Sequence, residues 1–243
     1  MIVNANDMGS RLAAGNVLSF EMRKFRGSEL RSVWETKPKN PTEELIAFSK
    51  AIRDCIDPES CNVDDLMNSL TIYDTWQLVV MQWQASGVPM ALYGTCQHPV
   101  YHYVDAKGNQ SSEFSAANVP EGAKVLSVDS CGHRASSNLL AHDVEILYVA
   151  SDCMEKRPVE DIEFPMLRHL FEDDYDITDR THLLMMALSE HDIDEMEASD
   201  FMKTSRWLSD NVHGVRNNAF VLCPHCARQS TTTWDMGIRR FLE

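Results

Sequence analysis

A Cys-x-x-Cys turn near the C-terminus places the strongest constraint on how this chain can fold. The turn is Cys223-Pro-His-Cys226, and segments of β character flank it, 218–222 before it and 230–234 after it. Two strands joined by such a turn form one half of a zinc ribbon, in which both thiolates point at one metal ion. Structural zinc is almost always four-coordinate, so the rest of the chain is expected to supply two further ligands.

Cys96 and Cys131 are the best candidates for the two missing ligands. Cys96 ends the β-like run 91–95, and Cys131 is followed by Gly132, where a knuckle must turn tightly so that its N–H groups face the sulfur. The two cysteines then form a split knuckle, and residues 97–130 are an inserted loop that is expected to carry its own hairpin or a binding surface. The alternative is that both are ordinary buried thiols, since free cysteine is among the most buried residue types.

The other metal-binding side chains have a weaker context. Three histidines close to the cysteines are reserve ligands: His98, His133 and His225. Three cysteines lack a knuckle context and are interpreted as packing residues: Cys55, Cys61 and Cys153. A catalytic zinc would keep an open coordination position near an acid or base, and no His-Glu-x-x-His or His-x-Glu pattern supports one.

The sequence also offers no recognisable catalytic machinery. It contains no phosphate loop, dinucleotide fingerprint or nucleophile elbow. Paired acids such as Asp173 and Asp174 belong to a charge run, which is typical of a solvated surface. The expectation is therefore a protein that is not an enzyme.

The amino-acid composition limits the classes of protein to which the chain can belong. The chain has 243 residues, of which 44% are hydrophobic, which is normal for a globular protein with a sizeable core. No apolar run approaches the length of a membrane span, and the first residues lack the pattern of a signal peptide. Seven cysteines are an odd number, so metal-like spacing favours a reducing compartment over a disulfide scaffold.

The charge of the chain is strongly negative and uneven. The formal net charge of −15 disfavours nucleic acid as the main partner. Residues 152–200 contain 16 acidic and 4 basic side chains, whereas basic residues dominate from 201 to the end. The acidic stretch is interpreted as a solvated face, and the alternative is a charge-complementary surface for assembly.

Hydrophobic periodicity predicts an α+β protein in which a zinc-ribbon β element joins distant segments. Residues 1–35 have β character, and helices are expected over 41–55, 72–84, 195–212 and 235–242. For the first of these helices, Asn40 is the expected N-cap, Pro41 suits the first helical position, and Glu43 is a candidate to close a capping box. A return strand of the ribbon is expected within 139–149. The predicted organisation is an N-terminal β segment with helices (1–87), a first ribbon half (88–150), an acidic helical region (151–213), and a second ribbon half with a terminal helix (214–243).

The order of these parts resembles the family of baseplate hub and hub-assembly proteins of T-even-type contractile-tailed phages. Three groups of segments carry the resemblance: Leu18–Phe25; Glu44–Cys55 with Val63–Leu66 and Ile72–Trp76; and Phe201–His213 with Phe220–Cys226 and Gly237–Phe241. They are similar to an early β segment, to a helix with an acidic link and a long apolar helix, and to a closing helix with a Cys-x-x-Cys turn and a terminal helix. The chain departs from a regular ribbon in its split first knuckle.

The resemblance implies a structural component of a phage tail baseplate hub whose partners are other baseplate and tail proteins. It places the protein in the virion tail baseplate and, during assembly, in the host cytoplasm. The structural zinc expected from the cysteine pattern would be held by Cys96, Cys131, Cys223 and Cys226. Two alternatives stay open: a hub-assembly chaperone that is absent from the mature virion, and a zinc-ribbon module associated with nucleic acid.

Overall fold

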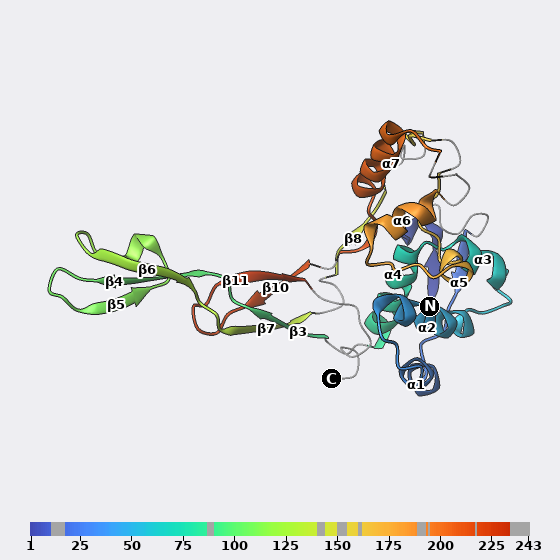
Figure 1. Ribbon diagram of the computed structural model, residues 1–243. Coiled ribbons are helices and arrows are strands. Elements are labelled where there is room, and N and C mark those ends of the chain that lie inside the picture. Colours follow the sequence, from blue (N-terminus) through green and yellow to red (C-terminus); the bar gives the residue numbers. More distant parts are fainter. Residues whose placement is uncertain are drawn as a thin grey trace. The chain divides into compact units, whose positions relative to one another are not determined.

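The structure is a computed structural model that describes residues 1–10, 18–86, 90–139, 144–149, 155–159, 162–188, 193, 195–216 and 218–233. Over these residues the chain is an α+β protein, as the sequence predicts. It divides into two compact units, labelled by their elements in Figure 1. The helical unit contains the described residues of Met1–Val88 and Ala141–Arg216, and the ribbon unit contains those of Pro89–Leu140 and Asn217–Asp235.

The helical unit holds the α-helices and two small antiparallel sheets. Its helices are α1 (Gly27–Glu35), α2 (Pro41–Cys55), α3 (Val63–Ser69), α4 (Ile72–Ser86), α5 (His169–Glu172), α6 (Arg180–Ala187) and α7 (Ala198–Asp210). A 3-10 turn, η1, spans Ala5–Asp7. Its paired strands are β1 (Ile2–Asn4) with β2 (Ser19–Glu21), and β8 (Ile146–Leu147) with β9 (Gly214–Val215).

The helix α2 begins as its sequence predicts. The Asn40 side chain accepts a hydrogen bond from the Glu43 N–H at 2.8 Å, and Pro41 occupies the first turn, where its missing N–H leaves no donor unpaired. The Glu43 carboxylate does not close the expected capping box, because it accepts from the N–H of Lys39 instead, at 2.8 Å. The helix therefore has the predicted cap with a different partner for its acidic residue.

The main core lies between α2 and α4, which pack against each other through their apolar faces. The rings of Phe48 and Trp76 lie 6.0 Å apart, edge to face. A second core cluster surrounds Trp207, whose ring stacks on Phe164 at 5.0 Å. Both clusters belong to the helical unit, which can therefore bury apolar surface without the ribbon.

A buried polar network joins the N-terminal segment to α4 and β9. Asp74 is fully buried, and its carboxylate accepts from the Ser10 N–H at 3.1 Å and from the Thr71 hydroxyl at 2.8 Å. The Thr71 oxygen also lies 3.1 Å from Nε2 of His213. Burial lowers the pKa of His213. Gly9 has no room for a side chain here, because a Cβ atom would lie 2.3 Å from the backbone nitrogen of Gly214.

The β character predicted for 1–35 is only partly right, because Gly27–Glu35 is the helix α1. Leu30 and Val33 lie at helical spacing and face the core, which outweighs local β preference. Glu29 stabilises the first turn of this helix. Its carboxylate accepts a hydrogen bond from the Arg26 N–H at 2.6 Å and forms an ion pair with Arg23 at 2.8 Å. The predicted terminal helix at 235–242 and the packing role of Cys153 lie outside the described residues.

The ribbon unit consists of two antiparallel sheets. The first is the ribbon itself, with the order β11-β10-β7-β3, and the second is an inserted sheet with the order β5-β4-β6. The ribbon strands are β3 (Met90–Thr95), β7 (Arg134–Leu139), β10 (Asn218–Leu222) and β11 (Gln229–Thr233). The strands of the inserted sheet are β4 (Pro99–Val104), β5 (Gln110–Glu113) and β6 (Lys124–Ser130), with a 3-10 turn, η2, at Ala116–Asn118.

The position of the return strand corrects the sequence prediction. The strand that pairs with β3 is β7, which begins at Arg134 opposite Thr95 and not within 139–149. The chain reverses its direction at Gly132, so pairing with β3 begins two residues later, at Arg134. Residues 144–149, expected in the first ribbon half, lie in the helical unit, where β8 pairs with β9. The inserted segment 97–130 carries its own hairpin, β4–β5, which is one of the two expectations, and β6 pairs with the other side of β4.

In the described parts of the chain, no helix is both long enough and apolar enough to cross a membrane.

The described helices within 151–213 are α5, α6 and α7. The helix expected at 195–212 is α7, which begins at Ala198 and ends at Asp210.

Candidate metal centre

Four cysteines from two distant parts of the sequence meet at one end of the ribbon sheet. They are Cys96, Cys131, Cys223 and Cys226, and their sulfur atoms all lie within 4.8 Å of one another. The Sγ atoms of Cys96 and Cys226 are 3.6 Å apart, and those of Cys131 and Cys223 are 3.8 Å apart. This is the set that the sequence predicts.

The spacing of the sulfurs suits a tetrahedral metal ion. A Zn–S bond of about 2.3 Å in a regular tetrahedron puts neighbouring sulfurs about 3.8 Å apart. Cys96 and Cys223 are buried, and Cys131 and Cys226 are half-buried. Four thiols held this close without a cation would have to stay largely protonated, because adjacent thiolates repel one another. The cluster could therefore hold a metal ion with soft ligands.

The Cys223–Cys226 turn is a knuckle closed by two backbone hydrogen bonds. The Cys223 N–H donates to the Arg228 carbonyl at 3.0 Å, and the Ala227 N–H donates to the Cys223 carbonyl at 2.9 Å. The turn connects β10 to β11, whose register pairs Leu222 with Gln229. The local sequence thus determines both the strand pairing and the direction of the two thiols.

Cys96 and Cys131 form a knuckle with the same hydrogen bonds, although 34 residues separate them in the sequence. The Cys96 N–H donates to the His133 carbonyl at 2.9 Å, and the Gly132 N–H donates to the Cys96 carbonyl at 3.0 Å. Each bond has its counterpart in the other knuckle, with Gly132 in the place of Ala227. The split knuckle is therefore a regular one that contains an insertion.

The insertion is closed at its base by one further hydrogen bond. The Cys131 N–H donates to the carbonyl of His98 at 2.8 Å, and β4 and β6 begin their pairing next to it, with Pro99 opposite Ser130. The inserted sheet thus leaves the knuckle and returns to it at neighbouring backbone positions. This explains how the two thiols keep knuckle geometry across the insertion.

The residue after the second cysteine of each knuckle has a left-handed backbone. Gly132 has φ +69° and Ala227 has φ +55°. Glycine adopts this conformation without steric cost, whereas an L-residue with a side chain pays about 1 kcal/mol or more. Glycine therefore suits the left-handed backbone at position 132, whereas the backbone of Ala227 is strained.

We expect opposite effects from exchanging the residue types at these two positions. Ala227→Gly should raise the stability of the ribbon unit by about 0.5–1 kcal/mol, and Gly132→Ala should lower it by about 1 kcal/mol. A Cβ atom at position 132 would meet nothing closer than the Ser130 carbonyl at 3.8 Å, so the effect isolates backbone strain. The measurement is the denaturant midpoint at which the ribbon unit unfolds. Midpoints that shift in the same direction for both variants would contradict the assignment.

The thiols differ in how easily they ionise. The backbone N–H groups of Cys226 and His225 lower the pKa of the Cys223 thiol to about 6. Burial raises the pKa of Cys226 to about 12, and burial also raises the pKa of Cys131. Of these three thiols, Cys223 ionises most easily, and a bound cation would stabilise the other two as thiolates.

None of the reserve histidines belongs to the four-ligand cluster. The Nε2 atom of His98 hydrogen-bonds to the Gln229 carbonyl, which fastens the insertion to β11. The rings of His133 and His225 stack at 3.9 Å, and Phe114 contacts His225 edge to face at 5.2 Å. These histidines connect the two knuckles to each other and to the inserted sheet.

Sequence reasoning missed one neighbour of the sulfurs, Ser230. Its hydroxyl lies 3.7 Å from Sγ of Cys96 and donates toward it, so it joins β11 to the opposite knuckle. Nothing in the sequence marks this serine, because the contact depends on how the two hairpins meet. Hydrogen bonds to ligand sulfurs orient them and tune the metal.

The described cysteines outside the cluster lie in the helical unit. Cys55 is buried in the main core, and burial raises the pKa of its thiol to about 11. Cys61 is half-buried and packs against the same core. Both agree with the packing role predicted from their sequence context.

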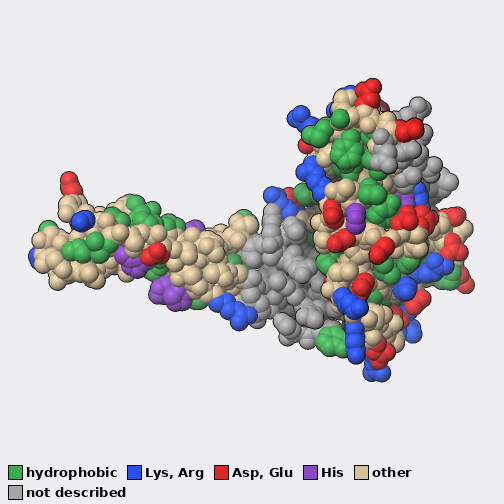
Figure 2. Space-filling view, in the orientation of Figure 1, with side chains coloured by type: hydrophobic (Ala, Val, Ile, Leu, Met, Phe, Trp, Pro, Cys, Tyr) green, Lys and Arg blue, Asp and Glu red, His purple; other side chains and the backbone are tan. Residues whose placement is uncertain are grey.

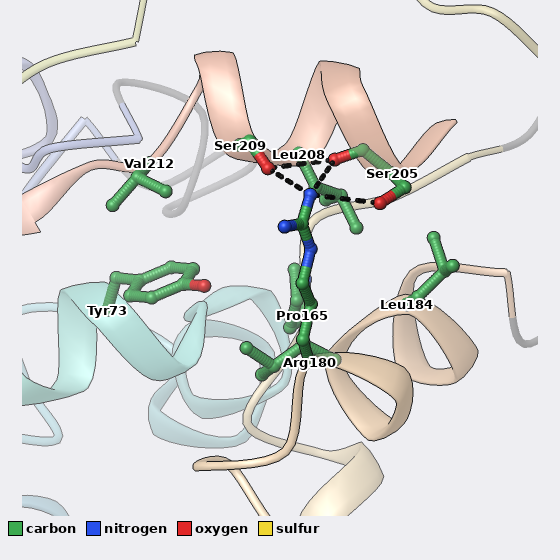
Figure 3. Close-up of a pocket in the computed structure, with 9 residues that line it drawn as sticks. Tyr73, Pro165, Arg180, Leu184, Ser205, Leu208, Ser209 and Val212 are labelled. Atoms are coloured by element: carbon green, nitrogen blue, oxygen red, sulfur yellow. Dashed lines mark hydrogen bonds between the residues drawn. The ribbon is translucent and has the colours of Figure 1, made fainter. Parts of the chain in front are cut away.

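A pocket of about 230 Å³ lies where α4, α6 and α7 meet in the helical unit (Figure 3). Arg180 extends from α6, and its Nη2 atom donates to the hydroxyls of Ser205 and Ser209 at 3.0 and 2.6 Å. Apolar side chains line the walls, among them Leu184 and Leu208. Arg180 therefore holds α7 against α6, and the pocket is the seam between these helices.

Comparisons of the chain with protein-family models, with curated proteins and with solved structures found no significant match. A function for the chain therefore rests on the sequence resemblance and on the geometry of the cysteine cluster.

Proposed function

We propose that the chain is a structural component of a phage tail baseplate hub and that the four thiolates bind one structural Zn²⁺. The cysteine cluster is the observation that carries the zinc proposal. It joins the hairpin β3–β7, which ends at Leu139, to the hairpin β10–β11, which begins at Asn218. A metal ion at this position would hold together two hairpins that share, among the described residues, one backbone pair, Leu222 with Ser136.

The donor set favours zinc in a structural role. Four thiolates suit Zn²⁺ or an iron–sulfur centre. Two knuckles that each present a pair of thiols at tetrahedral spacing are typical of a zinc ribbon, and the observed Sγ separations of 3.6 and 3.8 Å fit a single ion. With all four positions filled by protein, no coordination site is left for substrate or water, so the ion would stabilise the fold and not catalyse a reaction.

The baseplate assignment is supported by the resemblance of the chain's segments to the hub family. The acidic link 63–66 belongs to α3, and the apolar run from Ile72 begins α4 in the main core. The Cys-x-x-Cys turn closes the ribbon sheet. Net charge of −15 fits binding to protein surfaces of complementary charge better than binding to nucleic acid.

Quantitative mass spectrometry of density-purified particles, compared with the infected-cell lysate, tests the baseplate proposal. We expect the chain in particles at a fixed ratio to known tail proteins. Presence in the lysate together with absence from particles would overturn the structural role and favour the hub-assembly chaperone. A salt-dependent DNA gel shift at modest protein concentration would favour the nucleic-acid-associated module instead.

A further inference from the structure

The inserted sheet ends in an exposed strand. In the order β5-β4-β6, the strand β6 pairs with β4 on one side only, and no described strand pairs with its other edge. All seven residues of β6 are exposed. Three of them are large and apolar, and their exposed fractions are 44% for Val125, 52% for Leu126 and 52% for Val128. Hydrophobic side chains gather over this sheet in Figure 2.

An unpaired edge of this kind is a template for another strand, and proteins usually protect it with charges, cover or bulges. The β6 strand contains one such irregularity. His102 of β4 pairs with Ser127 and Tyr103 pairs with Val125, so Leu126 is the extra residue of a β-bulge. The bulge makes the edge a poor match for a regular strand of another protein.

The bulge also determines which side chains share a face of the sheet. Lys124 pairs with Val104 and Asp129 with Val100, which places both charged residues on one face. The Ser127 hydroxyl donates to the Asp129 carboxylate at 3.2 Å, in agreement with this assignment. On the opposite face, Val125 and Val128 lie beside Tyr103 and Tyr101, respectively.

This pattern is complementary to itself. When a second β6 lies antiparallel along the edge, with the two-fold axis between Leu126 and Ser127, Lys124 of each copy faces Asp129 of the other. In the same register Val125 faces Val128. Both pairs join residues of the same face, which antiparallel pairing requires. Without the bulge, these partners would point to opposite faces.

We propose that two copies of the chain associate by antiparallel pairing of their β6 strands into one continuous six-stranded sheet. Each copy contributes an identical bulge at the two-fold axis, which is a feature that a regular strand cannot match. The Lys124 ammonium has no hydrogen bond or ion pair among the described residues and is free to reach the partner. Asp129 lies 3.4 Å from His102 Nε2 and keeps a side chain that is 65% exposed. The four valines then extend the apolar face that begins at Tyr101 and Tyr103.

Charge reversal at the two ends of β6 tests the pairing. Lys124→Asp places Asp opposite Asp, and Asp129→Lys places Lys opposite Lys, each at two symmetric positions. The double variant Lys124→Asp/Asp129→Lys restores both pairs in exchanged positions. The interface is small, so we expect a dimer Kd on the order of 10–100 μM for the unaltered chain by sedimentation equilibrium. Each single reversal should raise it about tenfold, and the double variant should return it to within about threefold.

Two controls isolate the strand edge from the change in net charge. Lys107→Asp and Glu121→Lys make the same reversals at exposed positions of the inserted segment outside β6, and both should leave the Kd unchanged. Metal content and hydrogen exchange of β10 and β11 show whether each variant is folded. A chain that stays monomeric up to about 1 mM would overturn the proposal. So would a double variant that associates as weakly as its folded single parents.

Discussion

We expect the replacement of Cys223 or Cys226 by serine to abolish the proposed metal binding and to unfold the ribbon unit, while the helical unit stays folded. Among the described side chains of the ribbon unit, the buried hydrophobic residues are Tyr103, Ala135 and Val221, together with the thiols Cys96 and Cys223. So small a core cannot offset the conformational entropy of the strands. Structural zinc supplies about 10–16 kcal/mol in small metal-dependent domains, so the loss of one ligand removes the main stabilising term.

Hydrogen exchange followed by mass spectrometry separates the two units in this experiment. Peptides from β3, β7, β10 and β11 should lose protection in either variant, and peptides from α2 and α4 should keep it because their core lies elsewhere. Metal content should fall from one equivalent to nearly none. The control is Cys61→Ser, which removes a half-buried thiol outside the cluster and should retain both metal and ribbon protection. A Cys223→Ser protein with unchanged melting temperature would rule out a structural metal.

The parts of the centre that were predictable depend on local chemistry. The Cys-x-x-Cys turn determines its own strand pairing, and Gly132 marks the second thiol of the split knuckle because the turn needs a left-handed residue. Ala227 occupies the same conformation without the glycine signal, so its strain is visible only in the structure. The contact of Ser230 with Cys96 was equally hidden, because it joins two hairpins across the sheet.

For the helices too, features that nearby residues determine were predictable, and features that depend on distant residues were not. The helices α2 and α4 have a clear apolar periodicity, and α2 has a cap that the sequence shows directly. The helix α1 was missed because its first turn is closed by the Glu29 carboxylate on the Arg26 N–H, and arginine is not a usual capping residue. Residues 144–149 were misplaced because the pairing of β8 with β9 joins positions about seventy residues apart in the sequence.

The order of the ribbon strands was beyond prediction from the sequence. The two hairpins meet through the pairing of Leu222 with Ser136, and no alternation of side chains specifies this contact. The inserted sheet was predictable only as a hairpin. Its turn after β4 has clear signals, with the Asp105 carboxylate accepting from the N–H groups of Lys107 and Asn109 at 2.8 Å. The third strand, β6, depends on pairing across a bulge.

Deleting residues 99–130 will leave a ribbon that still binds one metal ion. The deletion joins His98 to Cys131 and creates Cys-Gln-His-Cys-Gly, which has the spacing of Cys223-Pro-His-Cys226. The ends of the deleted segment already meet, because the Cys131 N–H donates to the His98 carbonyl at 2.8 Å. The hydrogen bonds of Cys96 with Gly132 and His133 involve none of the removed residues. We therefore expect one equivalent of metal and an affinity within about tenfold of the full chain.

A deletion of only two further residues provides the matched control. Removing 97–130 joins Cys96 directly to Cys131, so the two thiols lose the intervening residues that let a knuckle aim both sulfurs at one ion. This variant should lose the metal and the protection of β10 and β11, although it differs from the first by only Gln97 and His98. Equal metal content in the two deletions would show that the first knuckle does not need its turn geometry. The deletion of 99–130 also removes β6, so this variant should be monomeric and still bind metal. That result would separate the role of the metal in folding from the role of the inserted sheet in association.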